Sequence, residues 1–355
     1  MEAKAFQEKV KDTILGKGKD FLISYGVSKG LKNFQAKDVY VWLYNRRELN
    51  PDKWSTLPLS FRKQIKSDYD FSLPVIKRES QSVDGTLKLL IELNDGNTIE
   101  CVYIPQGKRT TLCISSQAGC PLGCKFCLTG KGGFIRNLEV SEIISQIMVL
   151  EEKFSLFGKS YNIVIMGMGE PLLNFSNLKN ALEIITDGEG LAISRRRITV
   201  STVGIKEKFE EYLQDLNMPL LAISLHSAIQ EKRDKIIPSK SVLSLKDLRN
   251  LLQKNSRRNR EPVSIEYVVL KEFNDRKEDI DALVKFCKGL KVKVNLIHFN
   301  EHPLLEFKAA EEEEMVKIQD ILSENRISTT IRKSRGSDIN AACGQLLDFE
   351  RLREK

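Results

Sequence analysis

Residues 111–127 read TLCISSQAGCPLGCKFC and contain the strongest indication of the fold class. The first five, 111–115, form a short, largely apolar run that is typical of a strand in a parallel sheet. The last eight, 120–127, form a loop whose three cysteines have the spacing C-x3-C-x2-C. In α/β sheets the reactive loops follow the carboxyl ends of the strands. A strand that leads into such a loop therefore predicts an α/β sheet with a site at this edge.

The rest of the chain repeats this alternation of strand and helix. Amphipathic stretches separate the strand-like runs at a spacing that indicates serial β-α units. We therefore predict an α/β fold with a parallel sheet and helices outside it, either a barrel or a large part of one, preceded by a small, mostly helical accessory domain. The further strands are expected at residues 162–166, 197–202, 220–225, 263–270, 292–299 and 328–332, and the helices at 140–154, 177–185, 245–254, 279–288 and 310–322.

The segment before residue 111 has a different pattern. Residues 1–85 show helical spacing of apolar positions, with a break at Asn50-Pro51. The turn sequence Asn-Asp-Gly-Asn at 94–97 joins two β-rich runs and predicts a hairpin. The expected domains are a basic, helical accessory domain (1–85), a connecting β-hairpin (86–105), the core (106–346) and a tail (347–355).

Composition excludes several classes of protein. The chain has 355 residues, of which 41% are hydrophobic and 29% charged, so it is neither disordered nor fibrous. No apolar stretch approaches the roughly 18 residues that cross a membrane. The charged N-terminus lacks the apolar core of a signal peptide, which predicts a reducing cytoplasm. The count of seven cysteines is odd, so metal or thiol chemistry is favoured over a disulfide framework.

Positive charge is concentrated near the N-terminus. The net charge is +8, and residues 1–90 hold 17 Lys and Arg against 11 Asp and Glu. Aromatic residues lie among these cations, a combination that suits unpaired RNA bases and phosphates. The alternative is a solvated helical surface over an aromatic core. The residues concerned are Tyr40, Trp42, Tyr44 and Trp54.

The cysteine loop allows three interpretations. Cys120, Cys124 and Cys127 can hold one iron–sulfur cluster, and three ligands leave one iron of a four-iron cluster without a protein ligand. Structural zinc normally takes four ligands in paired C-x2-C form, and a second such pair is missing from the sequence. Three buried cysteines without a ligand suit a Gly- and Pro-containing loop poorly. The sequence therefore favours an iron–sulfur cluster, with zinc as the competing metal.

With Phe126 before its last cysteine, this loop resembles that of the radical S-adenosylmethionine superfamily. Further motifs are similar to those of the dual-cysteine RNA methyltransferases, the family that methylates C2 of adenine in 23S ribosomal RNA and in some tRNAs. The similarity extends from about residue 100 to residue 346. A sister family methylates C8 of the same ribosomal adenine, and Pro171 favours the C2 family. The matching motifs are GMGEPLLN at 167–174, Ser201-Thr202, Ser224-Leu225-His226 and AACGQL at 341–346.

This resemblance implies a partial (β/α)6-type TIM-like barrel as the core and an RNA-binding role for the N-terminal accessory domain. It also implies a role for each matching residue. Cys343 carries a methyl group as S-methylcysteine, and Cys113 is the resolving thiol that forms a transient disulfide with Cys343. Glu100 is the proton acceptor. Each turnover consumes two molecules of S-adenosylmethionine. Cys120, Cys124 and Cys127 hold the [4Fe–4S] cluster, and S-adenosylmethionine is bound by Gly169, Glu170, Ser201, Ser224, Leu225, His226 and Asn300.

The resemblance also implies partners. The substrates are 23S ribosomal RNA and tRNA, a flavodoxin-type protein donates the electron, and the enzyme acts as a monomer away from membranes. Basic runs at 195–197, 257–260 and 332–335 are expected to contact phosphates. The alternative functions are a C8 methyltransferase and a zinc-stabilised RNA-binding module without catalysis. Cys101 and Cys287 match no functional position and are expected to be buried core residues.

Overall fold

The structure, a computed structural model, describes residues 11–255 and 261–347 and divides into two compact units. The larger unit comprises residues 74–138, 150–179 and those from Ser194 onward. The smaller unit comprises the residues up to Leu73 together with 139–149 and 180–193. The basic run at 257–260 and all but the first residue of the expected tail lie outside the described residues.

The larger unit is built on one sheet of ten strands among the described residues, in the order β1-β2-β3-β4-β7-β8-β9-β10-β11-β12. Neighbours from β4 to β12 pair in parallel, so the predicted α/β core is confirmed and each strand expected from residue 111 onward is present. The parallel strands are β4 (Arg109–Ile114), β7 (Asn162–Ile165), β8 (Ile198–Thr202), β9 (Leu220–Ser224), β10 (Val263–Val269), β11 (Val292–His298) and β12 (Thr329–Arg332).

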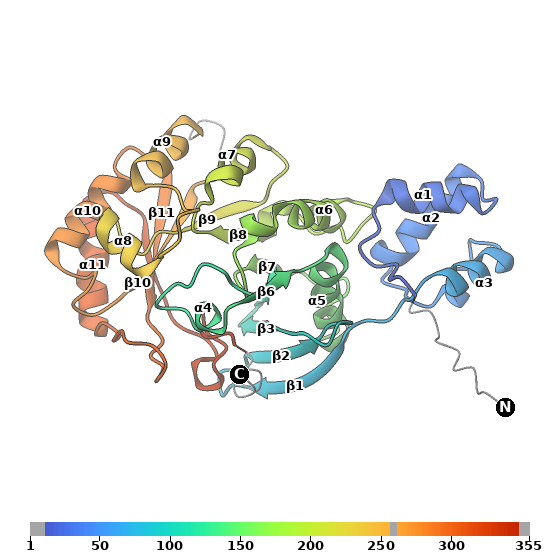
Figure 1. Cartoon of the computed structure of the whole chain (residues 1–355), viewed down its shortest axis with the longest axis horizontal. Coiled ribbons are helices and arrows are strands. Elements are labelled where there is room, and N and C mark those ends of the chain that lie inside the picture. Colours follow the sequence, from blue (N-terminus) through green and yellow to red (C-terminus); the bar gives the residue numbers. More distant parts are fainter. Residues whose placement is uncertain (1–10, 256–260, 348–355) are drawn as a thin grey trace, which may run out of the picture. The chain divides into compact units, whose positions relative to one another are not determined.

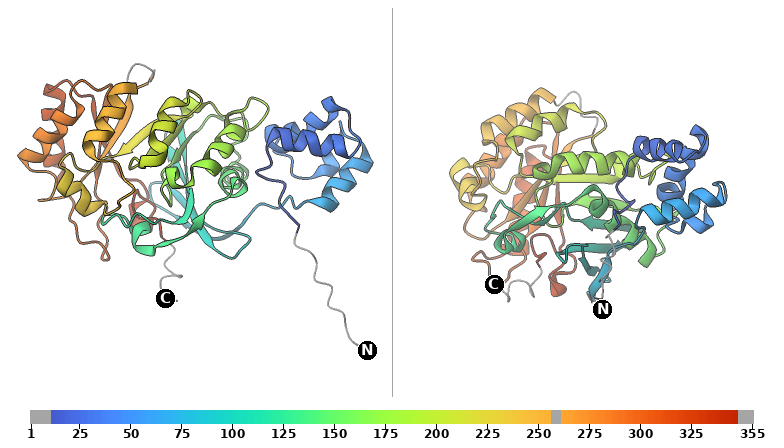
Figure 2. Two further views of the ribbon diagram at one scale, coloured as in Figure 1. Left: turned by 45° about the horizontal axis from the view of Figure 1, so that its top comes forward. Right: turned by 45° about the vertical axis from the view of Figure 1, so that its right-hand side comes forward.

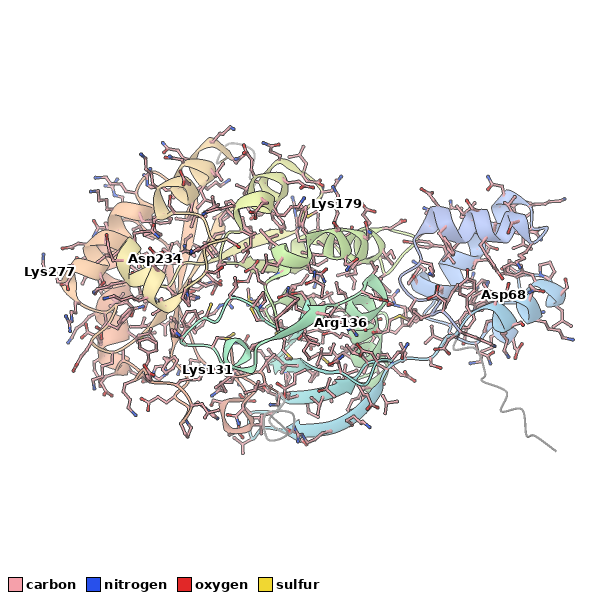
Figure 3. All side chains as sticks on the ribbon, viewed as in Figure 1. Asp68, Lys131, Arg136, Lys179, Asp234 and Lys277 are labelled. Carbon is pink, nitrogen blue, oxygen red and sulfur yellow. The ribbon has the colours of Figure 1, made fainter. Side chains whose placement is uncertain are left out.

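From β8 onward, helices connect the parallel strands of the larger unit and lie outside the curved sheet (Figures 1 and 2). Every residue of β10 is buried, as expected for a strand with both faces covered. The polar faces of the helices meet solvent: Lys277 projects outward from the start of its helix (Figure 3). These helices are α7 (Lys206–Gln214), α8 (Gln230–Ile236), α9 (Leu245–Asn255), α10 (Lys277–Cys287) and α11 (Glu312–Glu324). Two earlier helices, α5 (Val140–Lys153) and α6 (Phe175–Thr186), are divided between the two units.

The antiparallel end of the sheet differs from the expected domain layout. The predicted hairpin is present as β2 (Leu87–Glu92) and β3 (Thr98–Gln106). It is not a separate connector, because β3 pairs with β4 and the hairpin continues the main sheet. Residues 75–81, which the sequence analysis placed in the helical region, form β1 (Val75–Gln81). Its side chains alternate between exposed and half-buried, and pairing with β2 outweighs the weak local signal.

Short elements follow the first parallel strand. A two-stranded sheet, β5 (Gln117–Gly119) and β6 (Phe134–Asn137), flanks the cysteine loop. Within this segment α4 (Leu128–Gly132) begins directly after Cys127. Three 3-10 turns are also present in the larger unit: η3 (Pro171–Asn174), η4 (Arg195–Arg197) and η5 (Ser337–Ile339).

The N-terminal part of the smaller unit is helical. Its elements are α1 (Lys19–Ser28), α2 (Asn33–Tyr40), the π-helical turn η1 (Val41–Asn45), the 3-10 turn η2 (Pro51–Lys53) and α3 (Leu59–Asp68). Tyr40, Tyr44 and Trp54 are fully buried, so these rings form the core of the unit and do not stack on RNA. Trp42 is partly exposed, and the Arg46 guanidinium lies 4.0 Å from its ring centre. The aromatic-core interpretation thus holds for three of the four rings.

None of the helices in residues 11–255 and 261–347 is both long enough and apolar enough to cross a membrane.

Candidate active site

A cavity of about 160 Å³ lies in the larger unit at the carboxyl ends of the parallel strands, where the α/β rule places a site. The cysteine loop and the loop that carries Cys343 also line it. Ten predicted residues meet there although they are spread over more than 200 positions of sequence. They are Cys120, Cys124, Cys127, Gly169, Glu170, Ser201, Ser224, His226, Asn300 and Cys343.

The cysteine loop is shaped by its backbone. Gly123 has φ of +65°, a left-handed conformation that glycine adopts without strain. The Lys125 N–H donates to the carbonyl of Ile236 at the end of α8, over 2.9 Å, which fixes the loop against the barrel. The loop then ends at Cys127, where α4 begins.

The three thiols of this loop are neighbours in a desolvated site. Burial raises the pKa of Cys120 to about 12, and the nearby Cys127 adds to the effect. Burial also raises the pKa of Cys124 far above its ordinary value, with Cys127 and Cys120 as further causes. A bound metal reverses this, because coordination deprotonates a thiol. Among the described residues, no three His, Cys, Asp or Glu side chains are grouped closely enough to hold a single metal ion. The donor set is all sulfur, which fits an iron–sulfur cluster.

Glu170 is a buried carboxyl at the cavity wall. Its Oε1 accepts from the Leu172 N–H and its Oε2 from the Val203 N–H, both over 3.0 Å. Burial nevertheless raises the pKa of Glu170 to about 7. A carboxyl held in this way at a cavity is suited to pair with a cationic group of a ligand.

Gly169 makes the approach to Glu170 possible. Its φ is +105°, and a Cβ at this position would lie 2.5 Å from Cβ of Gln117. The Gln117 side chain in turn accepts from the Glu170 N–H over 2.8 Å. Only glycine fits between this side chain and the cavity.

The other polar residues of the cavity come from successive strand ends. The hydroxyl oxygens of Ser201 and Ser224 lie 3.2 Å apart. Nδ1 of His226 accepts from the Val268 N–H over 3.0 Å, and Phe126 packs edge-on against its ring. Burial, with Arg233 as a second cause, lowers the pKa of His226 to about 3, so this histidine is neutral at physiological pH. With Nδ1 accepting, neutral His226 keeps its proton on Nε2 as a donor.

Three predicted site residues do not line the cavity. Leu225 is fully buried, and its backbone N–H donates to the carbonyl of Glu266. Glu100 is fully buried and forms an ion pair with Lys88, with 2.8 Å between Oε1 and Nζ. Cys113 is buried behind the cavity wall. Burial raises its pKa, and Cys343 is the next cause, so the two sulfurs are close enough to interact.

The predicted disulfide is not present. All seven cysteines lie in the described residues and are free thiols, including Cys113 and Cys343. Cys343 is exposed within the cavity. Desolvation by the surrounding protein raises the pKa of its thiol, against the opposing charge of Arg332. Cys101 and Cys287 are buried, as expected of core residues.

The cavity also contains a charged residue, Glu266, that was not predicted from the sequence. Glu266 on β10 is 3% exposed, its Oε1 accepts from the Asn295 side chain over 2.7 Å, and its Oε2 has no hydrogen-bond partner. Arg332 was expected only to contact RNA phosphates. Its guanidinium lies 4.0 Å from that Oε2, and the residue also lines the cavity. The sequence contained one indication of this residue: an acid stands within the mostly apolar run 263–269. An acid is rarely buried in a strand unless it has a partner.

The fold and the cavity define a class of protein. Three cysteines on one loop at the carboxyl edge of a partial barrel, facing polar strand ends, are the arrangement of a radical S-adenosylmethionine enzyme. Residues 114–287 match the family model described as the radical SAM superfamily. A crystal structure of a radical SAM methyltransferase from Sphaerobacter thermophilus is similar, with a TM-score of 0.88 and 31% identity, over 94% of this chain and 99% of that one.

Relatives at higher identity specify the family. A dual-specificity RNA methyltransferase RlmN from Campylobacter hominis is 40% identical over 91% of this chain and 94% of its own length. Proteins named as probable members from Flavobacterium johnsoniae (40% identity; 96% and 98% of the two chains) and Prochlorococcus marinus (42%; 94% and 97%) agree. The chain belongs to the RlmN family of dual-specificity RNA methyltransferases and is therefore an enzyme of the radical SAM superfamily, whose members use a [4Fe–4S] cluster and S-adenosylmethionine.

Proposed function

We propose that this enzyme methylates C2 of an adenine in 23S ribosomal RNA, at the peptidyl-transferase centre, and also in tRNA, through S-methylcysteine at Cys343. One observation supports this most: Cys343 lines the same cavity as Cys120, Cys124 and Cys127, although more than 200 residues separate it from them. An ordinary methyl transfer needs a nucleophilic target, and C2 of adenine is electrophilic. A cysteine that carries the methyl group beside a radical-generating site allows methylation without a nucleophilic carbon.

In this proposal Cys120, Cys124 and Cys127 hold one [4Fe–4S] cluster. Gly169, Glu170, Ser201, Ser224, His226 and Asn300 bind S-adenosylmethionine, and Leu225 contributes through its backbone. When bound, the reduced cluster and S-adenosylmethionine supply a 5′-deoxyadenosyl radical. Glu170 pairs with the cationic amino group, and neutral His226 donates a hydrogen bond from Nε2.

Cys343 and its neighbours act on the methyl group. The Cys343 thiol must ionise to accept a methyl group, and the charge of Arg332 favours the thiolate. Cys113 is the resolving thiol, whose disulfide with Cys343 forms only during turnover. Glu100 is the proton acceptor. Because both of its oxygens are engaged by Lys88 and the Leu347 N–H in this structure, that role requires those bonds to exchange.

The enzyme also needs contacts with RNA and with an electron donor. The basic residues between positions 11 and 73, in the helical part of the smaller unit, bind RNA phosphates, and the exposed run 195–197 adds further phosphate contacts. A flavodoxin-type protein donates the electron, and the enzyme is a monomer. A cytoplasmic location agrees with seven free thiols.

Mass spectrometry of nucleosides from separated 23S RNA and tRNA tests this function. Cells without the gene should lack 2-methyladenosine in both RNAs. The wild-type gene should restore it, and a Cys343→Ala gene should not. Gain of 8-methyladenosine would overturn the C2 assignment. A colourless, zinc-loaded protein that restores neither nucleoside would overturn the enzyme assignment in favour of an RNA-binding module.

A further inference from the structure

A buried ion pair lies beneath the segment that carries Cys343. We call residues 340–347 the Cys343 loop. Lys88 on β2 and Glu100 on β3 are 7% and 0% exposed, and the Lys88 Nζ lies 2.8 Å from Oε1 of Glu100. In the register of these strands Lys88 lies opposite Val102, two residues from Glu100, so the pair is a diagonal one on one face of the hairpin.

Each partner of this ion pair also bonds to one flank of the Cys343 loop. The Lys88 Nζ donates to the carbonyl of Asn340 over 3.0 Å. The Glu100 Oε2 accepts from the Leu347 N–H over 2.7 Å. Cys343 lies between these two attachment points. One ion pair on the hairpin therefore holds both ends of the loop.

The opposite side of the loop is attached to the cysteine loop and its helix. The Leu128 N–H donates to the carbonyl of Gly344, and the Thr129 hydroxyl donates to that of Leu346, each over 2.7 Å. Leu128 directly follows Cys127. The Cys343 loop is therefore held between the segment that carries the three cysteines and the hairpin that carries Lys88.

A buried ion pair contributes less to stability than its short distance suggests. Desolvation of two charges offsets much of their attraction, so an apolar pair of similar size often gives equal stability. Two apolar side chains cannot, however, bond to the Asn340 carbonyl and the Leu347 N–H. The property that only the charged pair supplies here is the attachment of the loop.

We infer that Lys88 is a positioning residue: through Glu100 and the Asn340 carbonyl it keeps the Cys343 loop in the conformation in which the thiol faces the cavity. The link to methyl transfer rests on the proposed function of Cys343. The attachment itself is a property of the loop and can be measured without turnover.

Two measurements on anaerobically purified holoenzyme test this inference. The first is the rate at which iodoacetamide alkylates Cys343, followed by peptide mass spectrometry. The second is kcat and KM for RNA methylation. Lys88→Met should increase the alkylation rate roughly tenfold, the scale of one lost charge-assisted hydrogen bond. It should lower kcat with little change in KM. Lys88→Arg should restore both, because a guanidinium can bond to both acceptors.

The control is Lys77→Met, which removes an exposed ion pair with Glu92 at the same end of the sheet. It should alter neither measurement. Because Lys88→Met leaves the Glu100 charge buried and can prevent folding, Lys88→Met/Glu100→Gln provides a second route. It buries no unpaired charge and should show the same faster alkylation.

Unchanged alkylation of Cys343 in the folded double variant would overturn the inference. So would a Lys88→Arg enzyme as impaired as Lys88→Met. If wild-type enzyme methylates no RNA, the proposed function fails. The alkylation rates then still decide whether Lys88 positions the loop.

Discussion

The raised pKa of Glu170 predicts a specific pH dependence of stability. Burial raises this pKa from 4.5 to about 7 in the folded protein. Between these values the native state binds more protons than the unfolded chain. The contribution of Glu170 to stability is therefore present at low pH and is lost as the pH rises through 7. One pKa unit corresponds to about 1.4 kcal/mol, so the free energy of unfolding should fall by about 2.5 kcal/mol between pH 5 and pH 8 because of this residue alone.

Glu170→Gln isolates this contribution. The free energy of unfolding, measured by urea denaturation under anaerobic conditions at several pH values, should show a difference between wild type and variant that shifts by about 2.5 kcal/mol over that range. At low pH the free energy of unfolding of the wild type should increase relative to that of the variant. Glu313→Gln, at an exposed position on α11, is the control. The difference in free energy of unfolding between this variant and wild type should not change with pH. A flat difference for Glu170→Gln would refute the conclusion that burial dominates at this carboxyl. Saturating S-adenosylmethionine should reduce the effect, because a cation beside Glu170 lowers its pKa.

Three further predictions follow from the site. Replacing Cys120, Cys124 or Cys127 singly with Ala should abolish the brown colour and the stoichiometric iron and sulfide of anaerobically purified protein; iron retained at wild-type level in any one variant would exclude that cysteine as a ligand. Cys113→Ala should accumulate a covalent protein–RNA adduct through Cys343, visible as a nuclease-sensitive band on a denaturing gel, whereas free turnover would contradict the resolving role. Gly169→Ala should impair binding of S-adenosylmethionine, measured by equilibrium dialysis, at least tenfold, because its Cβ would lie 2.5 Å from Gln117 at a positive φ; the control is Gly188→Ala, where a Cβ would meet nothing within 4 Å.

Much of the fold could be read from local patterns. The parallel strands were predicted because buried strands are apolar runs bounded by polar loops, a property of neighbouring residues. β1 was missed because its sequence, VIKRESQ, lacks a clear alternation of apolar and polar residues, and pairing with β2 makes it a strand. The rings of Tyr40, Tyr44 and Trp54 show the same limit. Their residue types suit both a core and an RNA surface, and packing decided for the core.

Local sequence patterns were sufficient to predict the chemistry that we propose for this site. The spacing of Cys120, Cys124 and Cys127 is local, so it indicates a cluster without knowledge of the fold, and the rule that loops follow strand ends places Glu170 and Cys343 near it. Which charges are buried, and which groups they bind, follows from three-dimensional contacts. Lys88 and Glu100 are charged residues of the kind expected on a solvated hairpin, yet both are buried. Glu266 is a single acid within a buried, mostly apolar strand. The reason is physical: burial and partners arise from contacts such as that of Glu100 with Leu347, 247 residues apart, which no local pattern encodes.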